Sequence, residues 1–142
     1  MGDMEMLMGL IYSDLRNIYH SINDYIGKEV PLKYKKFRKS SAAYSIQQAA
    51  EKMVKIQIYY SGKEYSNNKM YNHNLSFLIT YAESIGVKLY IPDYIRKNGV
   101  SLTNWESKGR YDIHLQVKID TMQRYYEVLV AWFEELKKMG YL

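Results

Sequence analysis

Apolar residues recur every three or four positions in four stretches of the chain, which is the period of a helix with one buried side. The first stretch follows Asp3, and its apolar residues are Met4, Leu7, Met8, Ile11, Leu15, Ile18, Ile22 and Ile26. Gly27 and Pro31 come next, and glycine and proline commonly mark the end of a helix. The pattern therefore predicts a long amphipathic helix over residues 4–26.

A second helix is predicted to begin at Ser40 or Ser41, where a hydroxyl can cap the first turn, and to run to about Ser61. On a helical wheel its buried side consists of Ile46, Ala49, Ala50, Met53, Ile56 and Tyr60. The opposite, solvent-facing side is expected to carry Gln48, Glu51, Lys52 and Lys55. Residues 28–39 are expected to form a basic connector between the two helices.

Two more stretches show the same period. One covers residues 74–85 before Gly86, and the other covers residues 119–139 before Gly140. Pro92 is expected to open a short helix that runs to about Asn98. No stretch alternates with a period of two, so strands are not expected. The sequence thus predicts an all-α fold, an up-and-down bundle of four long helices plus a short extra helix, with residues 1–142 as a single domain.

Composition excludes several kinds of chemistry. The chain has no cysteine, so thiolate catalysis and cysteine-based zinc sites are excluded. The three histidines lack metal-ligand spacing, and we expect no metal site and no cofactor. No apolar run reaches the ~20 residues of a membrane span, and the first residues are acidic where a signal peptide is basic. We therefore expect a cytoplasmic protein without a membrane partner.

The net positive charge of the chain favours polyanionic partners. Twenty Lys and Arg residues against fifteen Asp and Glu residues give a formal net charge of +5. Five of these cations fall within residues 33–39, where they alternate with Tyr34 and Phe37. Cations contact phosphates and aromatic rings stack on bases, which is what sequence-tolerant binding of single strands requires. Lys35, Lys36 and Arg38 are therefore candidate phosphate-binding residues, and the alternative is a solvated loop that binds nothing.

Three motifs in order along the chain carry a family resemblance. The second predicted helix contains Gln47-Gln48-Ala49-Ala50-Glu51-Lys52-Met53-Val54-Lys55, and His73-Asn74-Leu75 and Arg110-Tyr111 follow it. Together they resemble the HEPN family of helical nucleotide-binding domains. The resemblance implies a helical bundle, often dimeric, that engages a nucleotide or RNA. It adds Lys52, His73 and Arg110 as candidate phosphate-binding residues, whose ordinary alternatives are a solvated helix surface, a helix cap and a local salt bridge.

The same resemblance raises the question of catalysis. HEPN ribonuclease toxins carry an Arg and a His separated by four to six residues, with a polar residue after the Arg. Here three residues separate Arg110 from His114, and the residue after the Arg is Tyr111. We therefore expect binding without catalysis, through a basic, tyrosine-rich surface. One alternative is a metal-independent endoribonuclease toxin of a toxin–antitoxin pair that uses Arg110 and His114.

A second alternative is a helical protein-interaction module whose partner is a nucleotidyltransferase, since many HEPN relatives are encoded beside one. Self-association is also expected. The first predicted helix carries Tyr12, Tyr19 and Tyr25 beside its apolar stripe, more aromatic surface than one buried side requires. The resemblance implies pairing as well, so the sequence predicts a homodimer.

Overall fold

The computed structural model describes residues 2–27, 30–99, 101–102 and 117–141. Every regular element in this part of the chain is a helix, and the all-α bundle expected from the sequence is confirmed. The helices are α1 (Gly2–Ile26), α2 (Leu32–Tyr60), α3 (Asn67–Met70), α4 (Leu75–Ser84), α5 (Asp93–Lys97) and α7 (Ile119–Lys138). No helix in the described residues is long and apolar enough to cross a membrane.

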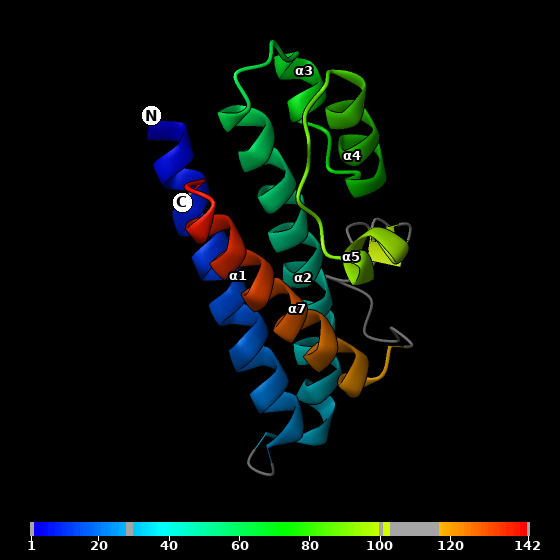
Figure 1. The fold of residues 1–142 in the computed structure, drawn as a ribbon. Helices are drawn as coiled ribbons and strands as arrows, with labels where there is room; N and C mark the ends of the chain where they lie inside the picture. Colours follow the sequence, from blue (N-terminus) through cyan, green and yellow to red (C-terminus); the bar gives the residue numbers. More distant parts are fainter. Residues whose placement is uncertain (1, 28–29, 100, 103–116, 142) are drawn as a thin grey trace.

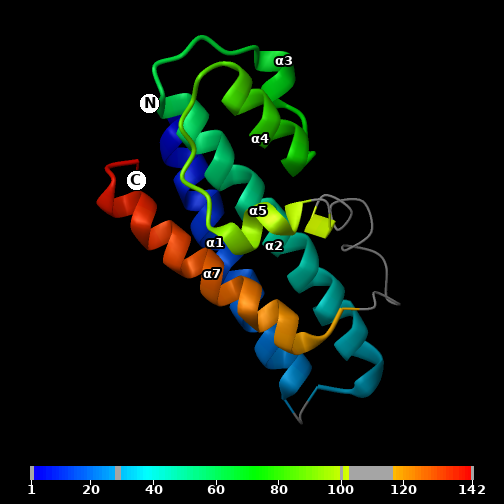
Figure 2. The same ribbon diagram turned by 45° about the vertical axis from the view of Figure 1, so that its right-hand side comes forward.

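Three long helices form the body of the molecule. α1 and α2 pack together along their length, and α7 lies against both of them (Figure 1). α4 packs on the C-terminal half of α2, with α3 beside it, while α5 contacts α7. The view in Figure 2 shows the start of α1 and the end of α7 at the same end of the bundle. α1 therefore runs antiparallel to α7.

The apolar stripes predicted for the first and last helices form most of the core, although Met8 and Ile26, both predicted in the first stripe, are 38% and 51% exposed. Ile11, Leu15, Ile18 and Ile22 of α1 are buried, as are Met122, Tyr125, Leu129, Trp132, Phe133 and Leu136 of α7. The predicted helix ends at Gly86 and Gly140 are also found, because both glycines adopt a positive φ angle of 88°, and Gly62, which follows α2, adopts a φ of 75°. Such angles are strained for residues with a Cβ atom, so glycine is the residue that suits these chain reversals.

The predicted start of the second helix was wrong. α2 begins at Leu32, directly after Pro31, and not at Ser40 or Ser41. Proline presets φ for a helix start, and residues 32–43 contain neither glycine nor proline, so the helix continues without interruption. The basic stretch expected as a connector therefore forms the first two turns of a 29-residue helix.

The predicted polar side of α2 was also wrong in part. Glu51 is 2% exposed and Lys55 is 9% exposed, although both were expected to face solvent, whereas Tyr60, expected in the core, is 44% exposed. The reason is that α2 is the central helix, in contact with α1, α4 and α7. A helix surrounded by neighbours on several sides must bury polar residues, and these then need polar partners.

Candidate functional site

The basic start of α2, residues 33–39, holds three of the predicted phosphate-binding residues. Lys35, Lys36 and Arg38 lie within one helical turn, about 4.5 Å along the axis. Arg38 Nε forms an ion pair with Asp24 Oδ2 of α1 at 3.1 Å, and both side chains are well exposed. Lys35 and Lys36 form no ion pair within the described residues. A phosphate can therefore approach these lysines without displacing a carboxylate of the described residues.

The aromatic residues of this stretch are exposed. Phe37 is 53% exposed and Tyr34 is 49% exposed, and residues three apart in a helix share one side. The ammonium group of Lys33 lies 5.0 Å from the centre of the Tyr34 ring. The first turns of α2 thus present two accessible rings among lysines, which is a surface suited to stacking and to phosphate attraction.

A groove between α1 and α2 continues from this surface. It has a volume of about 630 Å³, and Asp14 and Asn17 line it from α1. On the α2 side Phe37 and Tyr44 supply aromatic surface, and Ser41, Ser45, Gln48 and Lys52 supply polar groups. The volume lies within the range of small-molecule sites, which is about 300–1,000 Å³.

Hydrogen bonds fix the polar lining of this groove, which we call the α1–α2 groove. Asn17 Nδ2 donates to Ser45 Oγ at 2.6 Å and to Ser41 Oγ at 3.1 Å. These contacts hold α1 against α2 and leave the amide oxygen of Asn17 as an acceptor for a further group. Asparagine was not among the residues singled out from the sequence, because its role depends on a neighbour 24 or 28 positions away.

Lys52, predicted to bind phosphate, lies in the groove but has an internal partner. Its Nζ is 2.6 Å from Asp14 Oδ2, and the two side chains are 14% and 19% exposed. Burial raises the pKa of Asp14 above its ordinary value of 3.8, and the opposing attraction of Lys52 only partly offsets this. Lys52 is therefore engaged with a carboxylate and contributes less free positive charge than the sequence suggested.

The exposed ring of His73 contacts a buried polar cluster formed by Gln47, Glu51 and Lys55. Glu51 Oε1 accepts from Lys55 Nζ at 2.7 Å and lies 2.9 Å from His73 Nδ1. Gln47 Nε2 donates to Glu51 Oε2 at 3.2 Å and to the carbonyl oxygen of His73 at 3.0 Å. These contacts connect the segment before α4 to the middle of α2.

The helix cap at the start of α4 belongs to Asn74 and not to His73. The side chain of Asn74 accepts from the backbone N–H of Phe77 at 2.9 Å. This interaction satisfies one of the free N–H groups that would otherwise attract an anion. His73 thus lies beside an occupied helix start, with its ring held by Glu51.

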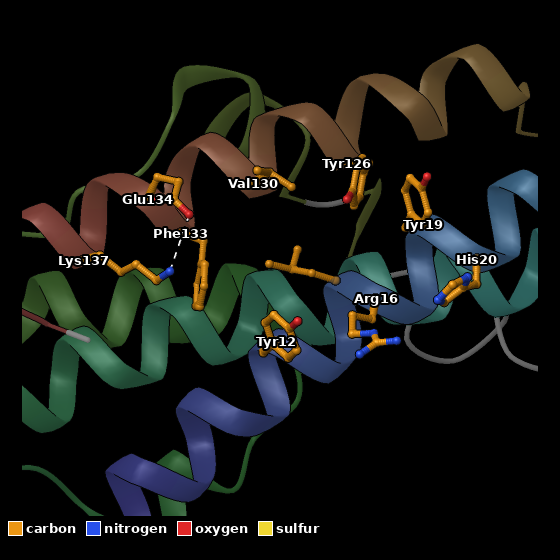
Figure 3. Close-up of a pocket in the computed structure, with 10 residues that line it drawn as sticks. Tyr12, Arg16, Tyr19, His20, Tyr126, Val130, Phe133, Glu134 and Lys137 are labelled. Atoms are coloured by element: carbon orange, nitrogen blue, oxygen red, sulfur yellow. Dashed lines mark ion pairs between the residues drawn. The ribbon is translucent and has the colours of Figure 1, made fainter.

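A second hollow lies between α1 and α7, on the other side of α1 (Figure 3). This α1–α7 pocket has a volume of about 440 Å³. Its apolar floor is Leu15 and Val130, and its aromatic walls are Tyr12, Tyr19, Tyr126 and Phe133. Two of the tyrosines expected to drive self-association, Tyr12 and Tyr19, are therefore half-exposed walls of a pocket.

Two cationic side chains and one anionic side chain line the α1–α7 pocket. These are Arg16, Lys137 and the carboxylate Glu134, which pairs with Lys137 at 3.5 Å, and His20 lines the pocket beside them. The guanidinium of Arg16 lies 6.0 Å from the centre of the Tyr12 ring, and Arg16 has no acidic partner in the described part of the chain. Burial raises the pKa of Tyr126, with Tyr19 adding to the effect, so the Tyr126 hydroxyl remains a protonated donor.

Arg110 and His114, the residues of the ribonuclease alternative, lie outside the described residues, and so does the predicted phosphate contact of Arg110. Among residues 2–27, 30–99, 101–102 and 117–141, no three His, Asp or Glu side chains gather as metal ligands would. No protein-family model, curated protein or solved structure matches this chain.

Proposed function

We propose that this domain binds single-stranded RNA or a nucleotide, with phosphates on the basic start of α2 and a base in the α1–α2 groove. The observation that carries the proposal is the junction of these two features at Phe37. This ring belongs to the cation-rich turns and also lines the groove. A phosphate held by Lys35 or Lys36 would leave the attached base within reach of Phe37.

The polar lining supports the same ligand. A base stacked on Phe37 or Tyr44 meets hydrogen-bonding groups of both kinds in the groove, the amides of Asn17 and Gln48 and the hydroxyl of Ser41. Since Lys52 is paired with Asp14, the attraction for phosphate comes mainly from the first turns of α2. The resemblance to the HEPN family points to the same class of ligand.

Binding without catalysis remains our proposal. None of the described residues that line the groove is a histidine, and the Nδ1–H of His73 donates to the Glu51 carboxylate. The ribonuclease alternative rests on Arg110 and His114 alone, and brisk cleavage of RNA that resists chelators and disappears in variants of either residue would establish it. The interaction with a nucleotidyltransferase stays an alternative that co-purification tests.

The proposal is tested by fluorescence anisotropy with a labelled oligoribonucleotide of about ten nucleotides, within the range of single-strand binding sites. Phe37→Leu should weaken binding by about 1–3 kcal/mol, the usual contribution of one stacked base. Replacing Lys35, Lys36 and Arg38 together by Gln should weaken it further, because three contacts to phosphate are lost.

The matched control replaces three exposed lysines far along the chain, Lys63, Lys88 and Lys97, by Gln. It removes the same charge from the molecule and leaves the start of α2 intact. If the control weakens binding as much as the variant of Lys35, Lys36 and Arg38, the effect is one of net charge and the proposed site is wrong. A titration of the same variants with a mononucleotide shows whether the site binds a single nucleotide or needs an RNA strand.

A further inference from the structure

The α1–α7 pocket is independent of the site proposed for RNA. Tyr12, Arg16 and Tyr19 face it, whereas Asp14 and Asn17 face the α1–α2 groove, and at 100° per residue the two groups lie on roughly opposite sides of α1. A ligand in one hollow therefore does not touch the lining of the other.

Aromatic surface is exposed here without a described partner element to cover it. Tyr12 is 56% exposed and Tyr19 is 50% exposed, although both border the floor formed by the buried Leu15 and the partly buried Val130. The Tyr19 and Tyr126 rings stand 6.0 Å apart at 42°, so they close one end of the hollow (Figure 3). Walls of this kind suit a flat ring, which gains contact on both faces and edges.

The charged side chains that line the pocket determine which polar group a ligand could carry. In Figure 3 Arg16 and His20 lie along one edge of the hollow, with Lys137 at its far end beside Phe133. Glu134, the one carboxylate in the lining, is engaged by Lys137, which leaves the guanidinium of Arg16 for an external anion. Guanidinium groups bind carboxylates and phosphates with two parallel hydrogen bonds.

We infer that the α1–α7 pocket binds a small planar aromatic molecule with one anionic group. The ring lies over Leu15 and Val130, between the aromatic walls, and the anion pairs with Arg16. The volume of about 440 Å³ suits a ligand of one or two fused rings. The anion is a carboxylate or a phosphate, since both match the same guanidinium geometry. A second copy of the chain is the competing occupant, and the experiment below distinguishes it.

The test is isothermal titration of the full chain with three probes, 2-naphthoate, 2-naphthyl phosphate and neutral 2-naphthylmethanol. We expect at least one anion to bind about tenfold more tightly than the alcohol, and comparison of the two anions identifies the preferred group. Arg16→Gln should remove this preference and leave the alcohol's affinity unchanged. Val130→Trp should fill the floor and abolish binding of all three probes, with thermal unfolding checked for each variant.

Arg38→Gln serves as the matched control, because it removes an arginine from the start of α2, which belongs to the site proposed for RNA. It should leave naphthoate binding unchanged, and Arg16→Gln should leave RNA binding unchanged, so failure of one proposal is distinguishable from failure of the other. Equal affinity for anions and alcohol, or an anion preference that survives Arg16→Gln, would overturn the inference. A concentration-dependent dimer whose formation excludes naphthoate would also overturn it and assign the pocket to a second copy.

Discussion

Glu51 is the position where the structure makes its sharpest prediction about stability. Its carboxylate is almost fully buried and accepts hydrogen bonds from Lys55 and Gln47, with His73 at 2.9 Å. Glu51→Gln preserves the shape of the side chain and removes its charge. The ammonium group of Lys55, only 11% exposed at its side chain, is then left without a counter-charge. Truncating one partner of a buried pair in this way costs about 3–5 kcal/mol.

We expect Glu51→Gln to lower the free energy of unfolding by about 3 kcal/mol, the lower end of this range, because the glutamine oxygen can still accept a hydrogen bond from Lys55. Urea unfolding monitored by far-UV circular dichroism gives the free energy of unfolding. Glu83→Gln is the matched control, since Glu83 pairs with Arg96 at 2.8 Å on the surface with both side chains nearly half exposed. Exposed pairs contribute about 0–1 kcal/mol, so the control should change stability little.

A double-mutant cycle with Lys55→Met isolates the pair. The loss in the double variant should be smaller than the sum of the two single losses by about 1–3 kcal/mol, because the second change removes the charge that the first left unpaired. If Glu51→Gln is no more destabilising than Glu83→Gln, the carboxylate is not buried in solution and the assignment of α2 as the central helix is wrong.

Three further predictions concern the core, a turn and pH. Met53→Ala and Leu129→Ala should each cost about 2–5 kcal/mol in urea unfolding, and losses under ~0.5 kcal/mol at both sites would mean that the helix faces are misassigned. Gly86→Ala should cost about 1–2 kcal/mol, since φ is 88° there, and a neutral effect would contradict that backbone conformation. Burial raises the pKa of Asp14 above 3.8, so protonation stabilises the folded state and that stability is lost as the pH rises through the folded pKa. The asparagine of Asp14→Asn does not titrate, so the stability of this variant relative to the wild type should rise as the pH goes from acid to neutral. A difference in the free energy of unfolding that stays constant with pH would contradict the direction of the pKa shift.

The sequence predicts the outer helices well and the central helix poorly, for a physical reason. α1 and α7 each bury one side, so the spacing of residues such as Ile11, Leu15 and Leu129 reveals the buried face directly. α2 contacts neighbours on several sides, and its buried Glu51 and Lys55 look like surface residues when partners distant in sequence are not known.

The candidate sites show the same limit. The cations of residues 33–39 and the exposure of Tyr12 and Tyr19 could be inferred from composition and helical spacing. The pairing of Lys52 with Asp14 could not, because it joins residues 38 positions apart on antiparallel helices. Helical periodicity reports which side of a helix is apolar, but it does not report which other helix lies against the polar side.

The most direct test of the proposed function is the salt dependence of RNA binding. For single strands the logarithm of the binding constant falls by about 0.7 per logarithmic unit of salt for each phosphate neutralised. Binding by the wild type should weaken steeply with salt, and the slope should drop by about two when Lys35, Lys36 and Arg38 are replaced together by Gln, since three contacts are lost. A slope that is the same in wild type and variant, or no binding at low salt, would contradict the claim that the start of α2 holds the phosphates.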